Sequence, residues 1–223
     1  MGMYRHGEHA VFMPSIKAVP ARIDYHDFIV KALVQRRTQL DMAFEVLTAR
    51  ASMLTDVAVK LVETLRSGHK VLVAGNGGSA AQAQHLAGEL VGRFKRERAP
   101  YAVISLTTDL AIITAVSNDY GYQDVFARQV RALGQPGDLL IAFSTSGESE
   151  NLVRAAQAGH EGLLTVVAVT GERPSRLERQ ADMTIHVPMI DTATIQELHM
   201  VVIHILCDLA ETRLSVCENE GNV

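Results

Sequence analysis

His85 and Glu89 are spaced to act together. They stand four residues apart in a segment with a helical pattern, so both side chains lie on one helix face. Imidazole nitrogen and carboxylate oxygen both bind zinc, and a glutamate with a tuned pKa also transfers protons. The same spacing is typical of an ordinary pair on a solvated helix. The pair becomes a candidate site because its helix follows a glycine-rich turn, Gly75-Asn76-Gly77-Gly78.

The glycine turn follows a short apolar strand, Val71 to Ala74. Its three glycines permit positive φ and a close approach to a ligand, and the N–H groups of the next helix attract an anion. Ser79 is the expected N-cap of that helix. The turn also loosely matches a dinucleotide fingerprint. That interpretation is disfavoured, because the acid expected about 20 residues further on is missing and the first candidate is Asp109.

A second polar loop, Ser144-Thr145-Ser146-Gly147-Glu148-Ser149, follows another apolar strand and opens a helix. Its hydroxyls and backbone N–H groups suit a phosphate monoester, which needs many hydrogen bonds from a compact shell. An ordinary turn with a capping serine is the alternative. The number of hydroxyls in this short loop favours phosphate.

The last helical segment carries four side chains with ligand or proton-transfer chemistry: Gln196, Glu197, His199 and His204. A single histidine on such an apolar helix is usually a core residue. The clustering leaves a functional site and a core role about equally supported. Cys207, in the same apolar run, is expected to be a buried small hydrophobe.

These residues require an α/β framework to position them. Helices are predicted over 24–66, with a break before Ser52, and strands and helices then alternate to a long helix from Thr192 to Leu214. Short apolar strands separated by helices predict a three-layer α/β/α fold with a five-stranded parallel sheet, preceded by N-terminal helices. Such sheets bind ligands at the carboxyl ends of their strands. The predicted strands are Val71–Ala74, Ala102–Leu106, Leu139–Phe143, Leu163–Val169 and Met183–Val187, and the loops at 75–79, 117–121 and 144–149 gather at those ends.

Length and composition predict a tail over 1–22, one domain over 23–217 that includes a helical arm at 23–67, and a second tail over 218–223. The chain has 223 residues, 48% of them hydrophobic, and a net charge of −4. This charge argues against a nucleic-acid binder, which usually carries a basic face. No signal-peptide core is apparent, and no apolar run approaches the ~18 residues of a membrane span, so no membrane partner is expected. Two cysteines imply no disulfide framework, and a reducing, cytoplasmic setting is expected.

Four stretches together resemble the sugar isomerase (SIS) domain family, and within it the phosphoheptose isomerases. The resemblance runs from about Asp24 to Leu214. The stretches are GNGGSAAQAQHLAGELVGRF (75–94), LTTDLAIITAVSNDYGYQDVFARQV (106–130), GDLLIAFSTSGESENLV (137–153) and IQELHMVVIHIL (195–206). The N-terminal extension and the segment 188–195 depart from the family pattern.

The resemblance implies a zinc ion, one per subunit, and an acid/base pair formed by Glu89 and His204. The implied zinc ligands are His85, Glu89, Gln196 and His204. The implied sugar-phosphate contacts are Asn76, Gly77, Gly78, Glu89, Asn118, Asp119, Ser144, Thr145, Ser146, Ser149 and Gln196.

The implied reaction is aldose–ketose isomerisation, which converts sedoheptulose 7-phosphate to D-glycero-D-manno-heptose 7-phosphate through an enediol. This would be the first step towards ADP- or GDP-heptose precursors, such as those of lipopolysaccharide. A non-catalytic SIS protein that binds a replication initiator or senses a sugar phosphate is the alternative, and the presence of Glu89 and His204 favours the enzyme.

The resemblance also implies a homotetramer with active sites at subunit junctions. Gln196 and His204 are eight residues apart, so a regular helix separates them by about 12 Å along its axis. Either Gln196 precedes the regular helix, or different subunits supply parts of one site. The second alternative is our hypothesis.

Overall fold

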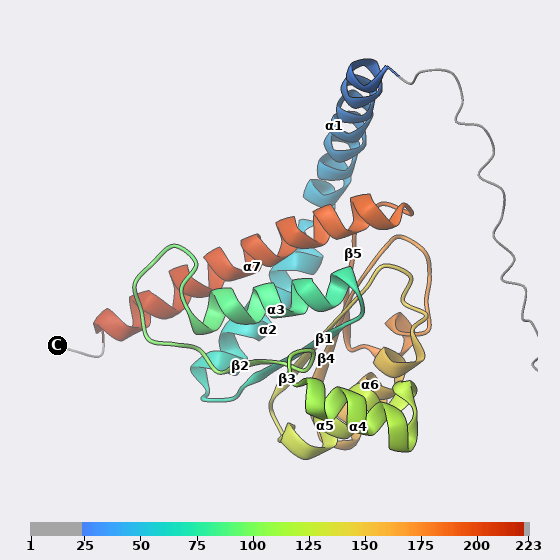
Figure 1. Cartoon of the computed structure of the whole chain (residues 1–223). Helices are drawn as coiled ribbons and strands as arrows, with labels where there is room; N and C mark the ends of the chain where they lie inside the picture. The colour runs from blue at the N-terminus through green and yellow to red at the C-terminus, as the bar shows by residue number, and fades with distance from the viewer. Residues whose placement is uncertain (1–23, 221–223) are drawn as a thin grey trace, which may run out of the picture. The chain divides into compact units, whose positions relative to one another are not determined.

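Five parallel strands form the centre of the fold, in the order β2-β1-β3-β4-β5 (Figure 1). The computed structural model describes residues 24–220, with side chains to residue 215, and the predicted tail over 1–22 lies outside this range. The strands are β1 Val71–Gly75, β2 Val103–Ser105, β3 Leu139–Ser144, β4 Thr165–Thr170 and β5 Met183–His186.

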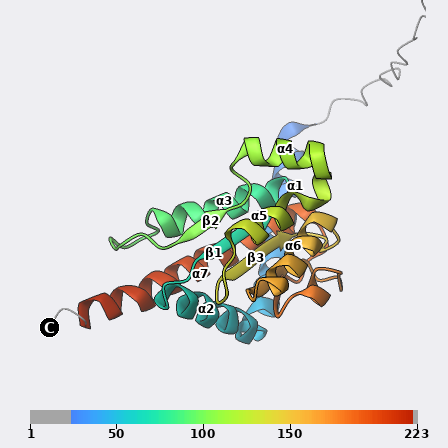
Figure 2. The ribbon, with the colours of Figure 1, turned by 90° about the horizontal axis from the view of Figure 1, so that it is seen from below.

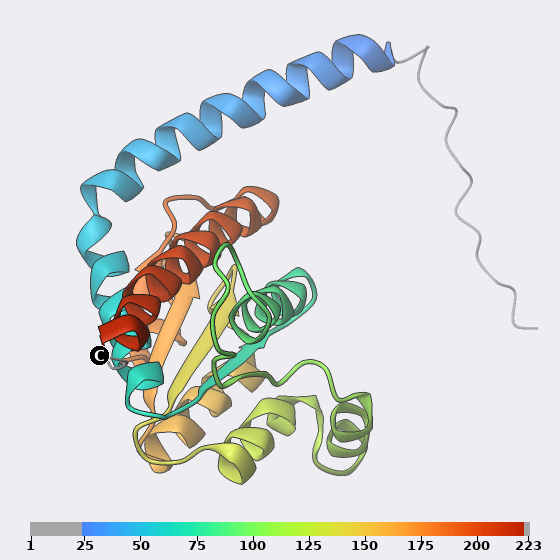
Figure 3. The same ribbon diagram turned by 90° about the vertical axis from the view of Figure 1, so that its left-hand side faces the viewer.

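Helices cover both faces of this sheet. The helices are α1 Tyr25–Ala49, α2 Ala51–Arg66, α3 Gly78–Val91, α4 Leu110–Tyr120, α5 Val125–Leu133, α6 Glu150–Glu161 and α7 Thr192–Glu220, with short 3₁₀ turns at Tyr122–Asp124 and Glu178–Gln180. Figures 2 and 3 show the sheet between helices on its two sides. Val71 and Val73 of β1 pack in a core with side chains of α2, α3 and α7, whereas the alternate residues Leu72 and Ala74 pack with α5 and α6. The three-layer α/β/α prediction is therefore confirmed.

Strand order reverses between β1 and β3, which lie side by side in the sheet. From β1 the chain continues to β2 on one side of the sheet, and from β3 it continues to β4 and β5 on the other side. In the shared register Gly75 lies opposite Phe143, and Ser144 lies opposite Thr170. The glycine turn and the serine loop therefore leave the sheet beside each other at the switch point, where open α/β sheets bind ligands.

The chain divides into two compact units after Arg37, within α1. In the second unit, Ala43 and Leu47 of α1 are buried in the core. In the first unit, Phe28 and Leu33 are exposed apolar side chains.

Two local predictions near the loops were wrong. Ser79 is not the N-cap of α3: the helix begins at Gly78, its cap residue is Gly77 at φ 54°, and Ser79 is buried in the first turn. The helix starts earlier than expected because Gly77 supplies the positive φ that ends the turn. The predicted loop over 117–121 is mostly helix, since α4 runs to Tyr120 and stops at Gly121, which takes φ 87°.

The last helix is longer and more apolar than the sequence interpretation allowed. It continues past the predicted end at Leu214 to Glu220. Its segment Thr192–Ser215 is long and apolar enough, by length and composition, to cross a membrane, contrary to the expectation that no run comes near that length. Half of its most apolar 18-residue stretch is buried, as in the core helix of a globular fold. The helix α7 packs against α2 and α3.

Candidate active site

Three side chains that can bind a metal or transfer a proton lie together between α3 and α7: His85, Glu89 and His204. These helices pack together and run in the same direction, since Gln82 contacts Gln196 near their starts and Phe94 contacts Glu211 beyond the end of α3. The Nε2 atoms of His85 and His204 are 3.1 Å apart, and His85 Nε2 lies 3.3 Å from an oxygen of Glu89.

The cluster is partly open to solvent. The side chain of His85 is 37% exposed and that of Glu89 is 25% exposed. Phe94, just past the end of α3, stacks on His204, with ring centroids 5.3 Å apart and planes 19° apart. One side of the His204 ring is thus covered, while a ligand can still reach the nitrogens.

The donor set suits a zinc ion. Two nitrogens bound to one tetrahedral zinc lie about 3.3 Å apart, given Zn–N distances near 2.0–2.1 Å. The two facing imidazole nitrogens, at 3.1 Å, are already close to that separation, and a carboxylate stands beside them. Among the residues whose side chains are described, no group of three or more His, Cys, Asp or Glu side chains is already arranged to hold a metal ion, so these three would have to adjust to bind one.

Gln196 does not join this cluster within one chain. Its side chain packs against Gly78 so closely that a Cβ there would overlap its amide. Gly78 precedes His85 by seven residues on α3, about 10 Å along the helix axis. Gln196 also lies inside α7, which begins at Thr192, so the idea that it precedes the regular helix is wrong.

The glycine turn is tied to the serine-loop side of the switch point by a pair of amides. Asn76 and Asn151 each donate to the other at 2.9 Å, and the Tyr122 hydroxyl donates to Asn76 at 2.7 Å. Asn151 is buried. A cavity of about 470 Å³ opens here, lined by Asn76, Tyr122, Gln123, Ser149, Glu150 and Asn151. Sequence reasoning predicted Asn76 but missed Asn151 and Tyr122, whose only signal is their position just after predicted site residues.

The serine loop is shaped by its own hydrogen bonds. The Ser144 hydroxyl accepts from the N–H of Gly147 at 3.0 Å, and the Ser146 hydroxyl accepts from the N–H of Glu148 at 3.2 Å. Gly147 takes φ 65°, and its Cα packs against Ser175. Ser149 directly precedes α6 and makes no side-chain cap bond. A cavity of about 250 Å³ beside the loop is lined by Thr145, Ser146, Glu148, Glu172, Arg173, Pro174, Met189, Ile190, Thr192 and Ile195.

Asn118 and Asp119 lie on the last turn of α4 rather than in a loop. Both are exposed, and the Asn118 amide donates to the Asp119 carboxylate at 2.8 Å. Their described hydrogen bond therefore joins them to each other, and their predicted contact with substrate stays a prediction.

Two other residues of α7 belong to the core. His199 is fully buried against Phe143, and burial lowers its pKa to about 4, so its ring is neutral at physiological pH. Cys207 is buried and unpaired, and burial raises the pKa of its thiol to about 12. Burial keeps the His199 ring away from solvent, and the raised pKa of Cys207 keeps its thiol protonated and unreactive.

Comparison with known proteins agrees with this geometry. The SIS domain family profile matches residues 38–171. The phosphoheptose isomerase of Aquifex aeolicus is 46% identical over 189 residues, covering 85% of this chain and 97% of the relative. That of Roseiflexus sp. is 47% identical over 175 residues, covering 78% of this chain and 89% of the relative.

Solved structures give the same result. The phosphoheptose isomerase GmhA from Neisseria gonorrhoeae superposes with a TM-score of 0.77 at 36% identity, covering 84% of this chain and 98% of that one. A phosphoheptose isomerase from Francisella tularensis has the same TM-score, 0.77, at 34% identity, covering 85% and 100%. This chain therefore belongs to the phosphoheptose isomerase family of SIS-domain proteins.

Proposed function

We propose that this chain is an aldose–ketose isomerase that converts sedoheptulose 7-phosphate to D-glycero-D-manno-heptose 7-phosphate. The observation that carries the proposal is the convergence of His85, Glu89 and His204 between α3 and α7, in a member of this family. A carboxylate and an imidazole in one cluster are what an enediol mechanism needs, because one group moves a carbon-bound proton and the other serves the oxygens.

In the proposed mechanism Glu89 takes the proton from the carbon beside the substrate carbonyl and returns it to the neighbouring carbon. His204 donates a proton to the carbonyl oxygen and takes one back from the other oxygen as the enediol collapses. Phe94 covers one side of the His204 ring and limits its rotation. His85, Glu89 and His204 would hold a zinc ion, which when bound supplies Lewis-acid polarisation of the carbonyl. Glu89 and His204 would then transfer protons through the carboxylate oxygen and the ring nitrogen that are not bound to the ion.

The loops at the switch point would bind the rest of the sugar phosphate. Ser144, Thr145, Ser146 and Ser149 surround the start of α6, where free N–H groups and hydroxyls favour a phosphate. Asn76, Gly77 and Gly78 then face the sugar hydroxyls, together with Asn118, Asp119 and Gln196.

We also propose a homotetramer in which Gln196 joins the zinc cluster from a neighbouring subunit. Gln196 lies about 10 Å along α3 from the histidines of its own chain. In addition, α1 exposes large apolar side chains such as Met42, at 60%, and Phe44, at 41%, which a partner would cover. A cytoplasmic location fits the free buried Cys207.

Turnover of sedoheptulose 7-phosphate by the purified chain tests the activity. We expect the chain to convert the substrate, a chelator to abolish this activity, and added zinc to restore it. We also expect a mass measured by light scattering that corresponds to four subunits. A folded, metal-free protein that tetramerises without converting the substrate would instead support the non-catalytic alternative.

Mixed oligomers test the shared site. Glu89 and His204 meet within one chain, so variants of these two residues would damage the same cluster. Glu89→Gln and Gln196→Ala chains are the informative pair, because a site built from the intact cluster of one and the intact Gln196 of the other should be active. Mixtures no more active than the separate variants would contradict sharing.

A further inference from the structure

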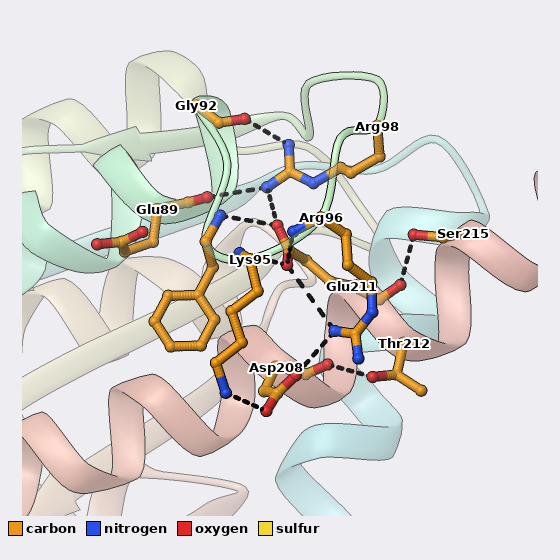
Figure 4. Close-up of polar contacts among 10 residues, drawn as sticks. Glu89, Gly92, Lys95, Arg96, Arg98, Asp208, Glu211, Thr212 and Ser215 are labelled. Carbon is orange, nitrogen blue, oxygen red and sulfur yellow. Dashed lines mark hydrogen bonds and ion pairs between the residues drawn. The ribbon is translucent and has the colours of Figure 1, made fainter.

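A buried ion pair lies beyond the active-site cluster, at the far end of α3. Glu211 of α7 is fully buried, and the Arg98 side chain that faces it at 3.3 Å is also 0% exposed (Figure 4). A buried pair of this kind is costly to desolvate, so its polar atoms need hydrogen-bond partners. Both Glu211 oxygens and both terminal nitrogens of Arg98 have partners, and Nε of Arg98 has none among the described residues. The groups that Glu211 and Arg98 bind therefore indicate what role the pair has in the structure.

The Glu211 carboxylate organises the turn that follows α3. Its oxygens accept the backbone N–H groups of Phe94 at 2.8 Å, Lys95 at 2.8 Å and Arg96 at 3.0 Å. Burial alone would raise the pKa of Glu211, but these three donors and Arg98 outweigh it and hold the pKa below its usual value. The carboxylate is therefore charged and fixes three consecutive residues of the turn.

The ion pair is connected to both residues of the proposed catalytic pair, to His204 through Phe94 and to Glu89 through Arg98. Phe94, whose N–H is bound by Glu211, stacks on His204. Arg98 donates to the backbone carbonyl of Glu89 at 2.8 Å and to that of Gly92 at 2.8 Å, which satisfies carbonyls at the end of α3.

We infer that Glu211 is a positioning residue, which sets the His204 ring through Phe94 and the Glu89 helix turn through Arg98. The inference rests on the proposed function for its catalytic meaning. The physical coupling from Glu211 to His204 is measurable without turnover.

The matched control is Asp208, one turn earlier on α7. Among the described residues its carboxylate binds only side chains, those of Lys95 at 2.7 Å and Arg96 at 2.8 Å in the segment after α3, and it is 37% exposed. An Asp208→Asn variant removes a charge of the same sign from the same helix without freeing a backbone N–H. It separates general electrostatics from positioning.

The test compares Glu211→Gln with Asp208→Asn by three measurements. In Glu211→Gln the His204 ring protons, assigned by selective labelling, should shift as the ring current of Phe94 is lost. Zinc affinity and kcat should each fall about tenfold or more, with KM within about twofold, as is usual for residues that orient a ligand. Asp208→Asn should leave the His204 ring-proton shifts as they are in the parent, and zinc affinity, kcat and KM within about twofold of the parent values. A folded Glu211→Gln protein that matches Asp208→Asn in His204 shift and zinc affinity would overturn the inference.

Phe94 variants keep the test decisive if Glu211→Gln does not fold. Phe94→Leu should reproduce the His204 shift and the weaker zinc binding, while Phe94→Tyr, which retains a stacked ring, should restore both. An unchanged His204 signal in Phe94→Leu would refute the coupling. If the parent binds zinc and shows the coupling but does not convert sedoheptulose 7-phosphate, the proposed function fails and the positioning inference stands.

Discussion

The α3–α7 cluster and the loops at the switch point are built in different ways. The cluster stands on two long helices that a buried carboxylate and a buried arginine hold at one end. The loops are shaped by single hydrogen bonds, by one amide pair, and by glycines at φ 54° and 65°. Proton transfer needs fixed geometry, whereas a phosphate and several hydroxyls are bound by many weaker contacts. We therefore expect damage to the cluster to lower kcat and damage to the loops to raise KM.

The largest effect is expected from Glu89→Gln. Loss of the proposed base should lower kcat by about 10²–10⁴-fold, with KM changed far less, because the loops remain intact. Steady-state kinetics with sedoheptulose 7-phosphate measure this. Glu97→Gln is the control, since that side chain is 92% exposed, and it should behave like the parent. A Glu89→Gln variant with a raised KM and an unchanged kcat would contradict the assignment of kcat to the cluster and KM to the loops.

Gly147→Ala should damage the serine loop more than Gly77→Ala damages the glycine turn. Both sites have positive φ, which costs an alanine at least about 1–2 kcal/mol of folding free energy. At Gly147 the added methyl also overlaps Ser175, whereas at Gly77 nothing lies within 4 Å. Overlap adds about 1–3 kcal/mol. Urea unfolding and KM of the two variants, measured in parallel, should show the larger change at Gly147, and equal changes would mean that the loop adjusts freely.

Asn151→Ala should have a smaller effect, and it should weaken the glycine turn and the serine-loop side together because Asn76 and Asn151 hold each other. It removes one partner of Asn76 and costs about 1–3 kcal/mol, because the half-buried Asn76 amide loses both hydrogen bonds with Asn151 and keeps only the one from Tyr122. We expect a modest rise in KM without loss of zinc binding. Zinc titration distinguishes this outcome from damage that spreads to α3 and α7.

The smallest effect concerns acid stability. The pKa of Glu211 is lowered as described above, and that of Asp138 is lowered as well: burial opposes the shift, but bonds from Lys70 and Gln135 outweigh it. A lowered folded-state pKa means that the stabilisation is present above the ordinary values of 4.5 and 3.8 and disappears as pH falls through the folded values.

Unfolding free energies measured from pH 6 down to pH 3 test this expectation. The parent should lose stability in this range, and Glu211→Gln should lose less with falling pH than the parent, in which Glu211 titrates. Parallel curves for Glu211→Gln and the parent would show that Glu211 makes no such contribution.

Features set by local sequence were predictable. The spacing of His85 and Glu89 fixes their common face on any helix, and strand–polar loop–helix patterns located both loops. The α/β architecture followed from apolar runs of strand length. Ser79 and the segment 117–121 were misjudged because one glycine at positive φ decides where each helix begins or ends.

Contacts across the fold were not predictable from spacing. Asn76 and Asn151 are 75 residues apart, and Phe94 and Glu211 are 117 apart. Such pairs exist only once the sheet and its covering helices are assembled. His204 was singled out by resemblance, since its spacing on an apolar helix fits a core residue equally well.

The continuity of α7 limits how this chain can change in length. Gln196, His204 and Glu211 all lie on one helix of 29 residues. A single residue inserted between Gln196 and His204 would turn everything after it by about 100° and advance it by about 1.5 Å. His204 and Glu211 would then both lose their partners on the α3 side. Insertions and deletions are therefore expected in the connection before Thr192, where a change in length leaves these spacings intact.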